Sequence, residues 1–96
     1  MLKKSLRIEQ TRSFARTFKK LRINQRLDLE DAIYRIVSDP EIGDKKSGDL
    51  SDVYVFKFKM VKQLWLLAYT YDLCTKVLIL IAVGPHENFY RDLKNC

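Results

Sequence analysis

Residues 53–60, Val-Tyr-Val-Phe-Lys-Phe-Lys-Met, alternate aromatic side chains with valine and lysine. A period of two is the pattern of a β-strand whose faces differ, here an aromatic face and one that becomes basic towards its end. Residues 63–71 and 76–83 are apolar on both faces, which is typical of central strands covered on each side. Because the connection over residues 72–75 is short, these two segments predict an antiparallel hairpin.

The chain before this region predicts a strand and a first helix. Residues 4–10 alternate Leu6 and Ile8 with polar residues, as a half-buried strand does. Thr11 is suited to cap a helix over residues 12–22. The apolar residues of that helix share one side, namely Phe14, Phe18 and Leu21. Its outer face is basic and carries Arg12, Arg16, Lys19 and Lys20.

A second helix follows after two or three residues, so the two helices form a hairpin. Asn24 is a plausible N-cap, and Asp39-Pro40 ends the helix because the residue before proline disfavours the helical region. One stripe of this helix is apolar and holds Leu29, Ile33, Ile36 and Val37. Residues 39–52, with two glycines and several aspartates, predict a surface loop.

Residues 86–94 predict a short closing helix that places Phe89 and Leu93 on the sheet. In such a helix His86 and Tyr90 are four residues apart and share another face. The order of elements predicts an α+β fold, with an N-terminal strand and a helical hairpin packed on a curved antiparallel sheet of about four strands.

Length and composition limit the protein to one domain over residues 1–96, since 96 residues with 47% apolar side chains supply one modest core. Cys74 and Cys96 fit no metal spacing, so we expect no metal and no cofactor, and unpaired thiols suit a reducing cytoplasm. The longest apolar run, residues 77–85, is too short to cross a bilayer. Polar residues interrupt any leader-like start, so we expect a soluble, unprocessed cytoplasmic protein.

Charge is distributed unevenly along the chain. Residues 1–26 hold nine Lys or Arg and one acidic residue, residues 27–52 hold three and eight, and residues 53–96 hold six and three, which makes +8, −5 and +3. A basic surface attracts polyanions by releasing their condensed counterions, so nucleic acid, the ribosome or an acidic protein are natural partners. A solvated helix face that maintains solubility is the alternative.

The chain has one histidine, His86, directly after the apolar segment 77–85. An imidazole titrates near neutral pH and therefore suits proton transfer. The alternative is a capping or packed residue.

At this point the chain resembles the RelE/ParE superfamily of bacterial type II toxins. The similarity covers nearly the whole chain. It is carried by residues 48–51 (Gly-Asp-Leu-Ser), residues 54–59 (Tyr-Val-Phe-Lys-Phe-Lys), residues 64–69 (Leu-Trp-Leu-Leu-Ala-Tyr) and residues 81–90 (Ile-Ala-Val-Gly-Pro-His-Glu-Asn-Phe-Tyr). Gly84, His86 and Tyr90 match the Gly-x-His-x-x-x-aromatic ending of the YafQ-like and YoeB-like ribonuclease toxins, and Gly-Pro-His-Glu-Asn-Phe-Tyr-Arg is similar to the ParE-like toxin branch.

The resemblance implies a RelE-like fold and a cytoplasmic toxin held by a cognate antitoxin, without a membrane or a metal. Ribonuclease members are endoribonucleases (mRNA interferases) that bind and cut messenger RNA on the ribosome and so inhibit translation. The 2′-hydroxyl attacks the scissile phosphate, one group removes its proton, another protonates the 5′-oxygen, and cations stabilise the phosphorane.

On this template His86 is a general acid or base, and Tyr90 stacks on a base or orients the phosphate. Lys57, Lys59 and Arg91 hold the RNA backbone and the transition state. Tyr54 or Trp65 could also stack on RNA if exposed. Each residue has a structural alternative: an ion pair of Arg91 with Glu87, edge protection by Lys57 and Lys59, and core packing of Tyr90 and Trp65.

One position departs from the ribonuclease pattern. Those relatives commonly carry arginine two residues before the glycine, where this chain has Ala82. Either Lys57, Lys59 or Arg91 replaces that cation, or the protein is not a nuclease. The alternatives are a non-enzymatic inhibitor of DNA gyrase, as in the ParE branch, and an inactive RNA- or protein-binding module with the same fold.

Overall fold

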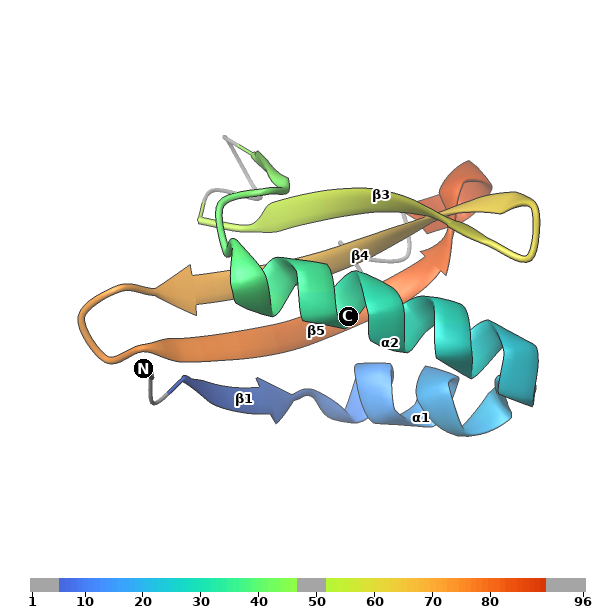
Figure 1. The fold of residues 1–96 in the computed structure, drawn as a ribbon, viewed down its shortest axis with the longest axis horizontal. Coiled ribbons are helices and arrows are strands. Elements are labelled where there is room, and N and C mark those ends of the chain that lie inside the picture. Colours follow the sequence, from blue (N-terminus) through green and yellow to red (C-terminus); the bar gives the residue numbers. More distant parts are fainter. Residues whose placement is uncertain (1–5, 47–51, 90–96) are drawn as a thin grey trace.

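The computed structural model describes residues 6–46 and 52–89 of the chain (Figure 1). The predicted closing helix beyond Phe89, the stretch Gly48–Ser51 and Cys96 lie outside the described residues. In chain order the elements are β1 Arg7–Gln10, α1 Arg12–Lys20, α2 Ile23–Ser38, β2 Asp44–Lys45, β3 Tyr54–Met60, β4 Gln63–Asp72, β5 Val77–Pro85 and the 3₁₀ helix His86–Asn88. The α+β class predicted from the sequence is confirmed.

The sheet has five strands in the order β1-β5-β4-β3-β2 among the described residues. The central meander is antiparallel, as predicted, with Lys57 opposite Leu66 in β3–β4 and Ala68 opposite Ala82 in β4–β5. Two strands differ from the prediction of about four antiparallel ones. β1 pairs with β5 in parallel, and residues 44–45, predicted as loop, form β2 against Tyr54 and Val55.

The two helices lie on one face of the sheet (Figure 1). Thr11 caps α1 as predicted, since its hydroxyl accepts a hydrogen bond from the Phe14 amide at 3.1 Å. The prediction that Asn24 caps α2 is wrong. The N-cap is Arg22, whose amide donates a hydrogen bond of 2.9 Å to the Gln25 side chain, and the helix begins at Ile23, two residues earlier than predicted.

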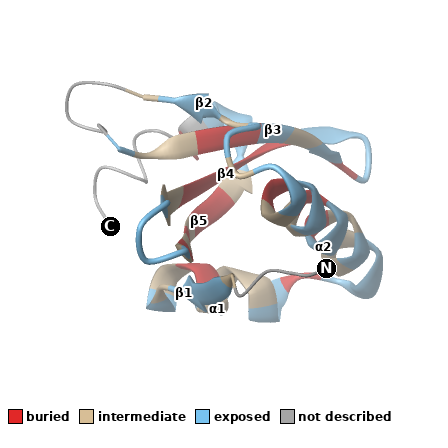
Figure 2. Cartoon of the chain, turned by 60° about the vertical axis from the view of Figure 1, so that its left-hand side comes forward, coloured by how far each residue is buried: buried red, intermediate tan, exposed pale blue. Residues whose placement is uncertain are grey.

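Most of the core lies between the helices and the sheet, where buried surfaces of α2 and the strands face each other (Figure 2). From the helices it takes Phe14, Leu21, Leu29, Ala32 and Ile36, and from the sheet Phe56, Met60, Trp65, Leu67, Tyr69, Leu78, Leu80 and Val83. The alternation predicted for β3 therefore directs Phe56 inward. β1 was predicted to bury one face, but all four of its residues are exposed, Ile8 to 47%, because the strand lies at the sheet edge.

A second, smaller cluster covers the opposite face of the sheet. It consists of Val55, Leu66, Ala68, Ala82 and Phe89, with Val53 and Ile81 packed against it. None of these residues belongs to a helix of the hairpin, so this face is separate from the main core. Phe89, just after the 3₁₀ helix, is 3% exposed, as its predicted place on the sheet requires.

A β-bulge interrupts the pairing of β4 with β5. Ala68 pairs with Ala82 but Tyr69 pairs with Leu80, which leaves Ile81 as the extra residue. Thr11 secures this bulge, because its hydroxyl donates a hydrogen bond to the Ile81 carbonyl and its amide donates to the Leu80 carbonyl. The cap of α1 and the irregular part of β5 are therefore one unit.

Within the described residues, no helix is both long and apolar enough to cross a membrane.

Candidate nucleic-acid interface

The predicted site residues that the structure describes, Lys57, Lys59 and His86, lie at one end of the sheet, where the β3–β4 turn is near the end of β5 (Figure 1). Lys57 pairs with Leu66, and Leu66 pairs with Gly84. Because neighbouring strands are about 4.8 Å apart, the backbones of Lys57 and Gly84 are separated by about 10 Å. Lys59, two residues nearer the β3–β4 turn, pairs with Leu64. The tertiary structure thus brings Lys57 and Lys59 of β3 to the same end of the sheet as Gly84 and His86 of the tail motif.

Lys57 and Lys59 are exposed, and neither forms an ion pair within the described residues. Val55 lies in the cluster on the face without helices, and side chains two residues apart share a face, so both lysines belong to that side. Beyond Val55, β3 has no partner on its outer side within the described strands, since β2 pairs only with Tyr54 and Val55. Within the described residues, Lys57 and Lys59 therefore present ammonium groups without an ion pair on a part of β3 whose outer edge has no partner strand.

A hollow of about 280 Å³ runs between this edge and α2. Lys57 and Lys59 line one side, and Asp28, Asp31 and Arg35 line the other. Arg35 is held by Asp31, with 3.2 Å between Nε and Oδ2. The groove is therefore of mixed charge, whereas the open face of the sheet is basic at this end.

His86 is exposed and follows Pro85, which pairs with Trp65 of β4. The predicted closing helix begins at His86, where residues His86–Asn88 form a 3₁₀ helix and Phe89 is α-helical, and the remainder of the predicted helix lies outside the described residues. Tyr90 and Arg91 lie outside the described residues, and their roles stay predictions.

Ala82 occupies the position where ribonuclease relatives commonly carry arginine. It is 8% exposed and lies in the apolar cluster with Leu66 and Ala68, closed by Phe89. A charged group at this position would be desolvated without a partner in that cluster. The cationic groups of the described site are therefore on β3, and the floor beside them is apolar.

Three aromatic residues were suggested for base stacking, and neither of the two that the structure describes, Trp65 and Tyr54, is available at this end. Trp65 is 8% exposed and belongs to the main core. Tyr54 lies at the other end of β3, where its ring stacks on Tyr69 with 5.3 Å between centroids. Leu64 is instead 38% exposed opposite Lys59, although its apolar strand predicted a covered position. Its place beside the turn is the only sequence signal for this exposure.

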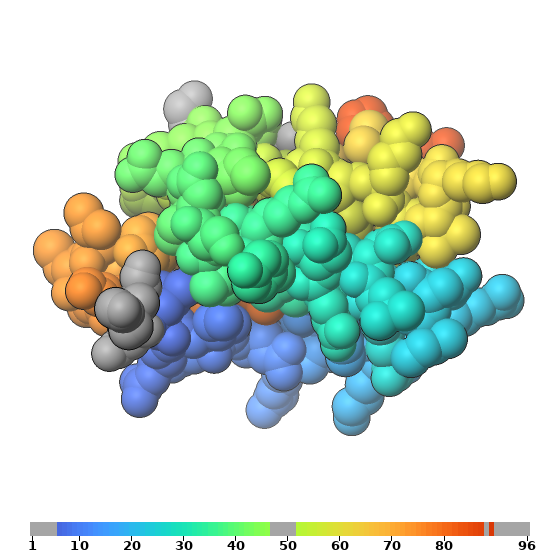
Figure 3. Space-filling view, viewed as in Figure 1, coloured from blue at the N-terminus to red at the C-terminus, as the bar shows by residue number. Residues whose placement is uncertain are grey.

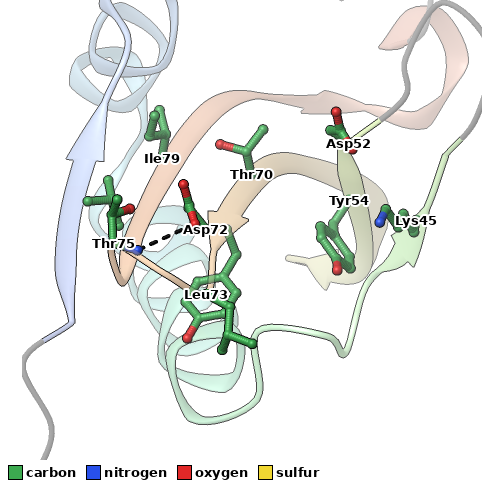
Figure 4. Close-up of a pocket in the computed structure, with 10 residues that line it drawn as sticks. Lys45, Asp52, Tyr54, Thr70, Asp72, Leu73, Thr75 and Ile79 are labelled. Atoms are coloured by element: carbon green, nitrogen blue, oxygen red, sulfur yellow. Dashed lines mark hydrogen bonds between the residues drawn. The ribbon is translucent and has the colours of Figure 1, made fainter.

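A larger hollow, of about 620 Å³, lies at the opposite end of the sheet (Figure 4). Its labelled lining includes Lys45, Asp52, Tyr54, Thr70 and Asp72. The Asp72 carboxylate already accepts hydrogen bonds from the Cys74 and Thr75 amides, so it serves the β4–β5 turn. Lys57, Lys59 and His86 do not line this hollow, and Tyr54, suggested for base stacking, is part of its lining.

The fold is similar to that of several solved toxins. A chain of the intact RelBE toxin-antitoxin complex of E. coli is 20% identical, with a TM-score of 0.70, over 86% of this chain and 99% of that one. For the toxin-antitoxin complex RelBE2 of Mycobacterium tuberculosis the identity is 13% and the TM-score 0.72, over 84% and 98%. A YoeB/ParE toxin from Agrobacterium tumefaciens is 14% identical, with a TM-score of 0.67, over 84% and 99%. At these identities the likeness establishes the fold.

Sequence comparison supplies the family. None of the curated protein sequences matches this chain. The sequence profile described as "ParE-like toxin of type II bacterial toxin-antitoxin system" matches residues 8–94, which is nearly the whole chain and includes both β3 and the tail motif. The fold, the basic strand and this match lead to one conclusion: the chain belongs to the ParE-like toxins of bacterial type II toxin-antitoxin systems.

Proposed function

We propose that this toxin inhibits translation by cutting messenger RNA on the ribosome, without a metal ion. The observation that supports the proposal is that His86, Lys57 and Lys59 are all exposed at one end of the sheet, within about two strand spacings of one another. A phosphodiester at this end meets an imidazole from the β5 side and two ammonium groups from β3. The scissile messenger RNA binds on the face opposite the helices.

In the proposed reaction, the 2′-hydroxyl of the RNA loses its proton and its oxygen attacks the adjacent phosphorus. The bond to the 5′-oxygen breaks, that oxygen takes up a proton, and a 2′,3′-cyclic phosphate remains. The His86 imidazole performs one of the two proton transfers. The ammonium groups of Lys57 and Lys59 stabilise the negative charge that grows on the phosphoryl oxygens. Tyr90 and Arg91 are the remaining proposed members of this site.

We also propose a cognate antitoxin as the protein partner. The solved relatives from E. coli and M. tuberculosis are toxin-antitoxin complexes, and the net charge of +6 favours an acidic neutralising segment. Both the toxin and its target then lie in the cytoplasm. A small protein encoded beside this gene is expected to co-purify with the toxin and to lose affinity at high salt.

A second candidate function rests on Ala82. Because that position is buried in an apolar cluster closed by Phe89, the chain lacks the strand cation of the ribonuclease relatives. Inhibition of DNA gyrase, the activity of the ParE branch, does not require a catalytic imidazole. This second candidate therefore predicts toxicity that is independent of His86.

Induction of the wild-type chain and of His86→Gln separates the two functions. Glu87→Gln is the matched control, since Glu87 is exposed in the same 3₁₀ helix. For the nuclease we expect new message ends within codons, lost in His86→Gln and kept in Glu87→Gln. Gyrase inhibition would instead give DNA breaks and growth arrest that persist in His86→Gln. A Lys57→Gln/Lys59→Gln variant is expected to lose cutting as well.

A further inference from the structure

The outer side of α1 carries a row of cations that the proposed cleavage site does not use. We call Arg12, Arg16, Lys19 and Lys20 the α1 ridge, and all of them are exposed. α1 lies along the lower margin of the molecule in Figure 3, where it is coloured blue. α1 packs on β5 beside β1, whereas Lys57 and Lys59 lie on β3, two strands away and on the other face. The two cationic surfaces are therefore separate.

The charge of the α1 ridge is not neutralised within the described residues. No acidic residue occurs between Glu9 and Asp28 in the sequence, and none of the ridge residues forms an ion pair in the described part of the chain. Two of the three acidic residues of α2 have other partners. Asp28 accepts a hydrogen bond from the Val61 amide at 2.8 Å, and Asp31 pairs with Arg35.

The arrangement of these cations opposes the stability of α1. Arg12 is the first residue of the helix, where the positive end of the helix dipole disfavours a cation. Arg16 follows Arg12 at i+4, and Lys20 follows Arg16 at i+4, so like charges face each other along the helix. Only Lys19 and Lys20, in the last turn, interact favourably with the dipole. Helix stability alone therefore does not account for Arg12 and Arg16.

Both ends of α1, the helix that carries the ridge, are held by contacts with the rest of the domain. Thr11 caps α1 and holds its start to β5, and Phe14 is buried at 2% exposure. At the other end, the Arg26 guanidinium lies 5.1 Å from the centroid of the Phe18 ring and donates a hydrogen bond to the Lys19 carbonyl at 3.2 Å. The helix that carries the cations is held at both ends, so the row keeps its spacing when a ligand binds.

We propose that the α1 ridge binds the backbone of double-helical RNA and so docks the toxin beside its cleavage site. From Arg12 to Lys20 the helix rises about 12 Å. A duplex carries one negative charge per about 1.7 Å of axis, so roughly seven phosphate charges accompany the ridge over that length. The choice of RNA over DNA rests on the proposed function, because a toxin that acts on the ribosome meets folded RNA.

The test measures binding of the purified full chain to a short duplex RNA and to a duplex DNA of the same sequence, over a series of salt concentrations. Arg12→Gln/Arg16→Gln removes two ridge charges. Lys45→Gln/Lys76→Gln is the matched control, since it removes two exposed charges outside α1. The thermal midpoint of each variant is measured in parallel, and removal of the like charges is expected to keep or raise it, which verifies folding.

For duplex RNA at about 0.1 M salt we expect Arg12→Gln/Arg16→Gln to bind about sixtyfold more weakly and to lower the salt slope by about 1.8, and the control to change affinity only a few-fold. If both variants lost RNA affinity equally, the net charge of the protein and not the α1 ridge would explain binding, and the proposal would be overturned. An unchanged RNA affinity of Arg12→Gln/Arg16→Gln would overturn it as well. Tighter binding of the wild-type chain to the DNA duplex than to the RNA duplex would assign the ridge to DNA. A loss of affinity for the antitoxin alone in Arg12→Gln/Arg16→Gln would assign it to a protein partner. Message cutting is scored separately, so this inference and the nuclease proposal fail independently.

Discussion

The Tyr69 hydroxyl accepts a hydrogen bond from the Gly43 amide at 3.0 Å and donates one to the Pro40 carbonyl at 2.7 Å. Tyr69 is fully buried in β4, and Gly43 lies just before β2. This single side chain therefore fixes the segment that leaves α2 to the middle of the sheet. Glycine is required at residue 43 by contact, because a Cβ there would lie 2.9 Å from the Tyr69 hydroxyl and 3.1 Å from the Val55 carbonyl oxygen.

Gly43→Ala is expected to lower the free energy of unfolding by about 1–3 kcal/mol, since the added methyl displaces either the phenol or the β3 backbone. Gly84→Ala is the matched control. Its Cβ would meet only the Phe89 ring at 3.7 Å, an ordinary contact, and should change stability little. Urea unfolding of both variants measures the difference. Equal effects of the two substitutions would contradict the close approach at Gly43.

Burial raises the pKa of Tyr69 from 10.0 to about 12, although the hydrogen bond from the Gly43 amide lowers it. The folded state thus holds this proton more tightly than the unfolded chain does. Its contribution to stability is complete below pH 10 and is lost as the pH rises towards 12. Tyr69→Phe should be less stable at neutral pH by about 1–3 kcal/mol, because the Gly43 amide loses its partner.

The same variant tests the alkaline behaviour. The difference in unfolding free energy between wild type and Tyr69→Phe should shrink between pH 10 and about 12, because the other titrating groups are common to both proteins. Urea titrations at several pH values in this range measure it. A difference that stays constant with pH would show that the phenol does not titrate differently in the two states.

Thr11→Val should lower the free energy of unfolding by about 2 kcal/mol, since it removes both the α1 cap and the hydrogen bond to the Ile81 carbonyl while keeping the side-chain shape. Thr11→Ser keeps the hydroxyl and is expected to retain most of the stability. Chemical unfolding compares the two variants. A Thr11→Val protein as stable as wild type would mean that water replaces the hydroxyl at the bulge.

The β3–β4 turn contains Val61 and Lys62 with φ of 48° and 73°, a left-handed conformation that disfavours β-branched residues most. Val61→Asn is therefore expected to raise the free energy of unfolding by about 1 kcal/mol, because asparagine tolerates this region. The amide that donates to Asp28 is retained. Thermal unfolding, with Val77→Asn in β5 as a control expected to destabilise, measures the gain. No gain at residue 61 would indicate that the turn is not strained.

Local pattern was sufficient to predict the α+β class, the helical hairpin, the Thr11 cap and the three-strand meander. Each of these features depends on residues within a few positions of one another in the sequence. The period of two in β3 and the apolar stripe of α2 indicate which face of each element is buried. The composition of α1 likewise predicted its basic outer face. The predicted start of α2 was wrong because the Gln25 side chain, and not that of Asn24, accepts the hydrogen bond from the Arg22 amide at the beginning of the helix.

Contacts between distant segments decided the rest. The parallel pairing of β1 with β5 joins residues about seventy positions apart, and no local period encodes which strand an edge strand will meet. The same holds for Ala82, which is buried in a cluster that residues of β3, β4 and β5 form with Phe89, and for Leu64, which is 38% exposed near the β3–β4 turn. The sequence suggested His86, Lys57 and Lys59 one by one as candidates, but strand register placed them at one end of the sheet, because hydrogen-bonded pairing fixes neighbours across the chain.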